Sequence, residues 1–165
     1  GFCPGAEFGP AKRWPQYHYA ELAKQLIDEG YQVVLFGSAK DHEAGNEILA
    51  ALNTEQQAWC RNLAGETQLD QAVILIAACK AIVTNDSGLM HVAAELNRPL
   101  VALYGPSSPD FTPPLSHKAR VIRLITGYHK VRKGDAAEGY HQSLIDITPQ
   151  RALEELNALL LQEEA

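Results

Sequence analysis

Short runs of apolar residues, many of them β-branched, alternate along the chain with longer segments in which apolar residues recur every three or four positions. Within the short runs the hydrophobicity is continuous, which is typical of parallel strands buried on both faces. We expect strands at 32–36, 81–84, 100–104 and 120–125, the end of another strand at Phe2 and Cys3, and a further short strand at 62–64.

The segments between these strands predict helices, because their apolar residues share one helical face. The expected helices span 15–30, 41–52, 67–79 and 87–96, and a last one begins at residue 148. Pro15 suits a first helical position, and Thr67 with Asp70 forms a capping-box pattern. The alternation of strands and helices with short connections predicts one α/β domain, residues 1–165, with a Rossmann-like, doubly wound parallel sheet.

Ligands of open parallel sheets bind at the carboxyl ends of the strands, where the loop 85–91 follows a buried strand and opens a helix. The N–H groups and dipole of a helix N-terminus favour an anion. Ser87 adds a hydroxyl donor, Gly88 permits close approach to the backbone, and His91 lies one turn further along, within reach of a phosphate. Asp86 can accept bonds from sugar hydroxyls. The alternative is that Asp86 or Ser87 is only a helix cap and His91 a packed core histidine.

A second loop, 4–15, is shaped by prolines and glycines and carries Lys12 and Arg13 just before a helix. Cations there are unfavourable for the helix dipole, which indicates an anion bound between them. The alternative is that both are solvated surface charges. The glycine spacing matches neither GxGxxG nor GxxxxGK, so a dinucleotide fingerprint and a P-loop lose support.

Weaker candidates lie in the remaining loops at the same edge. Ser38 and Asp41 follow the second strand, where a polar group often meets a ribose, although Asp41 can equally be a helix cap. Ser107 follows another strand and either lines the same cleft or belongs to a plain rigid turn. Leu89 is a weaker candidate within the loop 85–91.

Composition removes several classes of protein. The 165 residues are 46% apolar and 21% charged, which excludes intrinsic disorder, collagen and a coiled coil. The longest apolar run, 72–79, is far shorter than the ~20 residues of a membrane span. Three cysteines without CxxC spacing argue against a disulfide framework or a metal site and indicate a reducing, cytoplasmic compartment. A net charge of −6 argues against a nucleic-acid partner.

One segment departs from this acidic balance. Residues 111–134 hold six basic residues and no acidic one: Lys118, Arg120, Arg123, Lys130, Arg132 and Lys133. Such a face predicts attraction to an anionic partner or a membrane surface through Lys118 to Lys133. The alternative is a solvated edge. The chain also opens without Met in what reads as the tail of a strand, so we expect one domain of a longer protein.

The two loops together resemble those of glycosyltransferase family 9, the bacterial lipopolysaccharide heptosyltransferases, and the resemblance covers essentially the whole chain. It implies a GT-B enzyme with two Rossmann-like domains, of which this chain is the C-terminal, nucleotide-sugar domain and the N-terminal acceptor domain is absent. The reaction implied is the transfer of L-glycero-D-manno-heptose from ADP-heptose to the first heptose of the lipopolysaccharide inner core, with inversion and without a cofactor or bound metal.

The same resemblance implies roles for individual residues. Lys12 matches a phosphate-contacting lysine, and Asp86 faces the sugar. The residues matched to the diphosphate are Ser87, Gly88 and His91, while Gly5 and Ala6 match backbone that approaches the donor. The spacing around Asp41 is shifted from the family's ribose-binding carboxylate. The general base belongs to the absent domain, so this chain has no catalytic residue and is expected to bind ADP-heptose or ADP without catalysis.

Two further functions remain open from the residues. One is a GT-B transferase or epimerase that uses a UDP-sugar, because nothing in the sequence reads adenine against uracil. The other is a non-catalytic module that docks on anionic lipid through its basic segment. The expected location is the cytoplasm, with peripheral attachment to the cytoplasmic face of the inner membrane.

Overall fold

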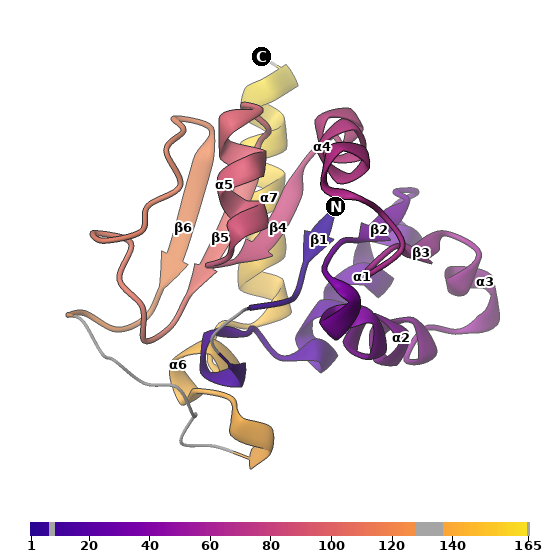
Figure 1. The fold of residues 1–165 in the computed structure, drawn as a ribbon, viewed down its shortest axis with the longest axis horizontal. Helices are drawn as coiled ribbons and strands as arrows, with labels where there is room; N and C mark the ends of the chain where they lie inside the picture. Colours follow the sequence, from indigo (N-terminus) through magenta and orange to yellow (C-terminus); the bar gives the residue numbers. More distant parts are fainter. Residues whose placement is uncertain (7–8, 128–136, 165) are drawn as a thin grey trace.

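Six parallel strands form one sheet in the order β3-β2-β1-β4-β5-β6 (Figure 1). The computed structural model describes residues 1–6, 9–127 and 137–164. The strands are β1 (Phe2–Cys3), β2 (Val33–Leu35), β3 (Cys60–Asn62), β4 (Ile82–Asn85), β5 (Leu100–Tyr104) and β6 (Ala119–Arg123). The predicted doubly wound parallel sheet is confirmed.

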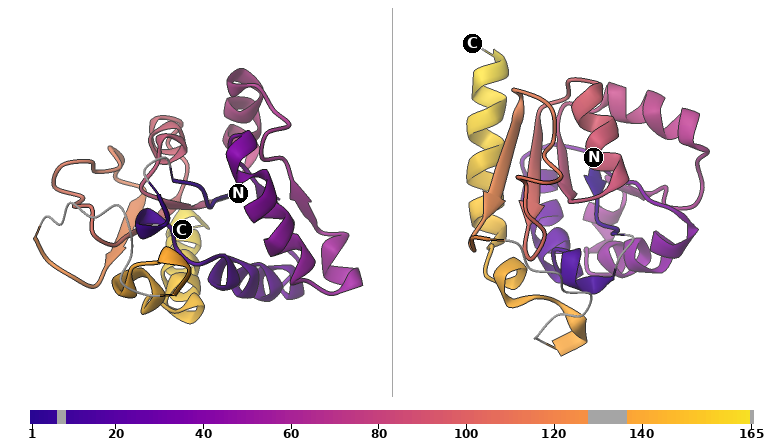
Figure 2. Two further views of the ribbon diagram at one scale, coloured as in Figure 1. Left: turned by 60° about the horizontal axis from the view of Figure 1, so that its bottom comes forward. Right: turned by 60° about the vertical axis from the view of Figure 1, so that its left-hand side comes forward.

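Helices cover both faces of this sheet. They are α1 (Gln16–Asp28), α2 (His42–Ala50), α3 (Thr54–Gln57), α4 (Leu69–Ala78), α5 (Gly88–Glu95), α6 (Gln142–Ile145) and α7 (Pro149–Glu164), with 3₁₀ turns η1 (Pro10–Lys12), η2 (Ala39–Asp41) and η3 (Ala137–Gly139). Buried side chains of α1, α2 and α7 share one core cluster, and those of α4 and α5 share the other. Figure 2 shows α7 and α5 on opposite sides of the strands.

Strand β5 is apolar at every position because both of its faces are buried. Successive side chains of a strand point to opposite faces. Val101 and Leu103 therefore belong to the core under α1 and α7, while Leu100, Ala102 and Tyr104 belong to the core under α4 and α5. All five residues are fully buried, as continuous hydrophobicity predicted.

Several element boundaries differ from the prediction. The short strand expected at 62–64 is Cys60–Asn62, and the last strand is Ala119–Arg123. The predicted capping box of Thr67 and Asp70 is wrong by one position, because Gln68 and Gln71 form it and the helix begins at Leu69. This register buries Ala72 and Ile76 against the sheet.

The strand order reverses beside β1. The chain steps outward from β1 to β2 and β3, then returns to place β4 on the other side of β1. The loops after β1 and β4 consequently leave the sheet in different directions, and a crevice opens between them. Crevices of this kind are where open α/β sheets bind ligands.

Candidate functional site

A pocket of about 400 Å³ lies at this reversal point, against the loops that follow β1, β2 and β4. Seven of the predicted site residues line it: Gly5, Ala6, Ser38, Asp41, Ser87, Gly88 and Leu89. The other lining residues are Cys3, Phe36, Gly37, Leu69 and Val92. Loops far apart in the sequence therefore meet as predicted. Apolar side chains directly after β2 and on α4 and α5 add a wall that the motifs did not indicate.

Helix α5 begins at this pocket. Ser87 is its N-cap residue and has an extended backbone, but its side chain makes no capping hydrogen bond. Its hydroxyl lies 3.5 Å from Thr84 Oγ1. Gly88 is exposed, and a Cβ built there has open space within 4 Å. The first N–H groups of a helix lack acceptors within the helix, so this end presents donors to an anion.

Lys12 and Asp86 come together beside that helix end. The Lys12 ammonium lies 3.9 Å from Asp86 Oδ2, and Thr112 Oγ1 donates a hydrogen bond of 3.2 Å to the same oxygen. Asp86 is 8% exposed, and a carboxylate with so little water needs such partners. Thr112 was missed from the sequence, because it lies 26 residues further along the chain.

Asp41 is held by the backbone of its own turn. Its Oδ2 accepts hydrogen bonds from Ser38 N at 2.9 Å and Ser38 Oγ at 3.1 Å, which makes it part of a capping box for η2. Arg13 Nη2 lies 3.8 Å from Asp41 Oδ1. The carboxyl group also fills the space beside two glycines, because a Cβ would come within 2.5 Å of it at Gly5 and 2.7 Å at Gly37. Asp41 is therefore a cap that borders the pocket.

His91 and Ser107 lie outside the lining of the pocket. His91 is exposed on α5, one turn beyond the N-terminus, so the alternative of a packed core histidine is wrong. Ser107 is buried in the loop after β5, and within the described part of the chain its hydroxyl has no hydrogen-bond partner. The sheet therefore brings His91 near the site and places Ser107 beneath the surface.

The buried thiol of Cys3, which lines the pocket, and the buried hydroxyl of Tyr104 are both neutral near neutral pH. Burial raises the pKa of the Cys3 thiol to about 12, and the thiol is therefore no nucleophile near neutral pH. Burial, followed by the nearby Asp86 carboxylate, also raises the pKa of the Tyr104 hydroxyl. Among residues 1–6, 9–127 and 137–164, no cluster of three or more His, Cys, Asp or Glu could hold a metal ion. This arrangement is suited to binding an anion.

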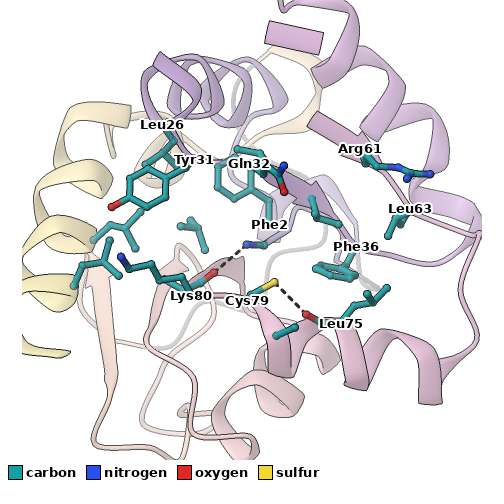
Figure 3. Close-up of a pocket in the computed structure, with 18 of the residues that line it drawn as sticks. Phe2, Leu26, Tyr31, Gln32, Phe36, Arg61, Leu63, Leu75, Cys79 and Lys80 are labelled. Atoms are coloured by element: carbon teal, nitrogen blue, oxygen red, sulfur yellow. Dashed lines mark hydrogen bonds between the residues drawn. The ribbon is translucent and has the colours of Figure 1, made fainter. Parts of the chain in front are cut away.

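A larger pocket of about 670 Å³ lies beside β1, β2 and β4 and shares Phe36 with the first pocket (Figure 3). It is bounded by the residues before β2 and β4, among them Tyr31, Gln32 and Lys80, and by Leu26 of α1 and Leu75 of α4. Its walls are mainly apolar. Its lining extends from the amino ends of β2 and β4 to Phe36 and Leu63, which follow β2 and β3, and includes none of the predicted anion-binding residues.

In the described part of the basic segment, the basic side chains form ion pairs and hydrogen bonds with neighbouring residues. Lys118 Nζ lies 3.2 Å from Glu163 and Arg120 Nη1 lies 3.2 Å from Glu155, both on α7. Arg123 Nε donates to Gly105 O at 2.9 Å. The remaining basic residues, Lys130, Arg132 and Lys133, lie outside the described residues. Among the helices that the structure describes, none has the length and apolar character to cross a bilayer.

Comparison with known proteins identifies the family to which this chain belongs. The sequence profile of glycosyltransferase family 9 (heptosyltransferase) matches residues 1–141. The chain is 98% identical over 165 residues to lipopolysaccharide heptosyltransferase 2 of Escherichia coli (strain K12), covering 100% of the chain and 47% of that protein. It is 69% identical over 161 residues to lipooligosaccharide heptosyltransferase 2 of Haemophilus influenzae, covering 97% of the chain and 46% of that protein.

A solved structure agrees with the sequence matches. The structure of E. coli ADP-heptose lps heptosyltransferase II matches with a TM-score of 0.93 and 92% identity, over 100% of this chain and 47% of that one. The chain thus spans about half the length of the relatives that it matches. It belongs to glycosyltransferase family 9, the heptosyltransferase family.

Proposed function

We propose that this chain is the nucleotide-sugar domain of a GT-B heptosyltransferase and that its donor is ADP-heptose. The observation that carries the proposal is the pocket at the strand-order reversal, which the N-terminus of α5 borders through Ser87 and Gly88. The Lys12–Asp86 pair lies outside the lining of this pocket, with Asp86 directly before Ser87 in the chain. One relative of known structure, from E. coli and 92% identical to this chain, is named an ADP-heptose heptosyltransferase. A diphosphate is the kind of anion that a helix N-terminus and a lysine bind together.

Each part of the donor then has an expected place at this site. The diphosphate lies at the α5 N-terminus, where backbone N–H groups, the Ser87 hydroxyl and the Lys12 ammonium donate to it, with His91 on the following turn. The heptose lies toward Asp86. The nucleoside lies along the apolar wall that includes Phe36 and Leu69, with its ribose near Ser38 and Asp41.

Heptosyl transfer requires stabilisation of the departing group. The acceptor hydroxyl oxygen bonds to the anomeric carbon, the bond from that carbon to the diphosphate oxygen breaks, and ADP leaves with the electron pair. Donors already fixed around the diphosphate stabilise this charge without a metal ion. A base must take the hydroxyl proton. We place that base, and the acceptor site for the first heptose of the lipopolysaccharide inner core, on the other half of the longer protein.

Titration calorimetry of the 165-residue chain tests the donor. We expect binding of ADP-heptose and ADP, weaker binding of UDP, and no turnover by this chain alone. Amide NMR shifts on addition of ADP should concentrate at Gly5, Lys12 and 86–91. A preference for UDP would replace the donor by a UDP-sugar. Binding to anionic vesicles that weakens with salt and ignores nucleotide would instead support a lipid-docking module at the inner membrane face.

A further inference from the structure

Strand β4 ends in a buried amide just before the candidate site. Asn85 is the last residue of β4 and is fully buried. It is absent from the lining of the pocket, whereas its neighbour Asp86 pairs with Lys12. Its side chain is directed instead toward the loop between β1 and α1, which passes the end of β4 (Figure 1).

The amide of Asn85 uses all of its hydrogen-bonding positions. Its Nδ2 donates to Pro4 O at 2.7 Å and to Gly5 O at 3.3 Å. Its Oδ1 accepts from Trp14 N at 3.0 Å and from the Tyr19 hydroxyl at 2.8 Å. Because backbone carbonyls only accept and a backbone N–H only donates, these partners require a side chain with both functions on adjacent atoms. A primary amide meets that requirement, while an alcohol or an apolar side chain of similar size does not.

These partners lie at the two ends of the loop that carries Lys12. Pro4 directly follows β1, and Trp14 comes two residues after Lys12. One side chain thus fastens both ends of the loop to β4, and the next residue of the chain, Asp86, receives the Lys12 ammonium at 3.9 Å. Asn85 therefore fixes the positions at which the loop that carries Lys12 begins and ends relative to β4.

We propose that Asn85 is a positioning residue, whose amide holds the β1–α1 loop so that Lys12 acts on the ligand bound at the α5 N-terminus. The inference rests on the proposed function, because it takes the ligand to be a nucleoside diphosphate. Asn85 itself does not touch that ligand. Its contribution reaches the ligand through Lys12, so the two residues are energetically coupled.

A double-mutant cycle with ADP as the probe tests this coupling. Lys12→Ala, in the otherwise unchanged chain, should lower the affinity for ADP about tenfold or more, as expected for the loss of a charge-assisted hydrogen bond. In the Asn85→Ala background the same change should lower it less than about threefold, because the ammonium is no longer held in place. Asn85→Ser gives a second, milder background. Affinities are measured by calorimetry well below each variant's melting temperature.

Asn62 provides the matched control. It is also the last residue of its strand, β3, and its amide also fastens a neighbouring segment, through His42 O at 2.9 Å, Asn46 Oδ1 at 3.0 Å and Ala64 N at 3.1 Å. Asn62→Ala should lower the melting temperature and leave the effect of Lys12→Ala intact. A loss of stability alone therefore does not reduce the effect of Lys12→Ala on ADP affinity, whereas loss of the Asn85 amide does.

The outcomes separate the two proposals. If the unchanged chain binds no ADP, the proposed function fails. If ADP binds and Lys12→Ala weakens it equally in every background, the donor site stands and the positioning role of Asn85 is wrong. Failure of both Asn85 variants to fold would assign the residue to stability of the fold and also overturn the positioning role.

Discussion

The side chain of Lys12 is one-quarter exposed, and its ammonium lies 3.9 Å from the nearly buried carboxylate of Asp86, which directly precedes the N-cap of α5. A cation in such a place binds a diphosphate more strongly than one surrounded by water. We predict that Lys12→Ala lowers ADP affinity by ~1–3 kcal/mol. Lys24→Ala is the control, because Lys24 lies on α1, where it pairs with Glu21. Equal calorimetric affinities for both variants would remove Lys12 from the site.

Two glycines that line the pocket should respond differently to an added methyl group. A Cβ at Gly5 would come within 2.5 Å of the Asp41 carboxyl, which Ser38 holds in place, whereas a Cβ at Gly88 meets open space. Gly5→Ala should lower the free energy of unfolding by ~1–3 kcal/mol, the usual effect of overpacking. Gly88→Ala should change it by less than about 0.5 kcal/mol. Urea unfolding of both variants checks this, and equal losses would contradict it.

At the scale of the element, helix α7 binds the sheet through one face. Leu156 is 3% exposed within the core, and Leu161 on the same helix is 67% exposed. Leu156→Ala should lower the free energy of unfolding by ~2–5 kcal/mol, because it removes buried surface and leaves a cavity. Leu161→Ala should change it by less than about 0.5 kcal/mol. Similar losses in chemical denaturation would show that α7 is docked differently.

Elements with a strong period were predictable, and short ones were not. The apolar stripe of α7 and the continuous run of β5 each reflect one local rule, so both appear nearly at their predicted bounds. Helices α3 and α6 were missed, because four residues are too few to show a helical period. The α3 capping box of Asn53 and Gln56 was the available signal for that helix.

At the scale of the molecule, the meeting of the loops at one edge of the sheet was predictable, and the bonds among them were not. Ligands bind at the carboxyl edge of a parallel sheet, and this rule brought the loops of Gly5, Ser38 and Ser87 together without any contact being known. The bonds from Thr112 to Asp86 and from Asn85 to Pro4 join residues 26 and 81 positions apart. No local pattern encodes such pairings, because they depend on how the loops pack after the sheet has formed.

The whole molecule also holds two thiols in its core, and these make its stability depend on alkaline pH. Burial raises the pKa of Cys3 to about 12 and that of Cys60 to about 11, from an ordinary value of 9.0. Above pH 9 the unfolded chain loses these protons while the folded chain keeps them. The stabilisation is therefore complete below pH 9 and is lost as the pH rises toward 11 and 12.

Urea unfolding between pH 8 and 10, under reducing conditions, measures this dependence. Each thiol should contribute a slope that approaches about −1.4 kcal/mol per pH unit above pH 9. Cys3→Ala should make the decline shallower than in the unchanged chain, because alanine has no proton to release. The window ends at pH 10, since buried Tyr19 and Tyr104, whose pKa values are also raised, add a decline of the same sign above it. Parallel pH profiles for the two chains would show that the Cys3 thiol ionises equally in the folded and unfolded states, which contradicts its burial at 1% exposure.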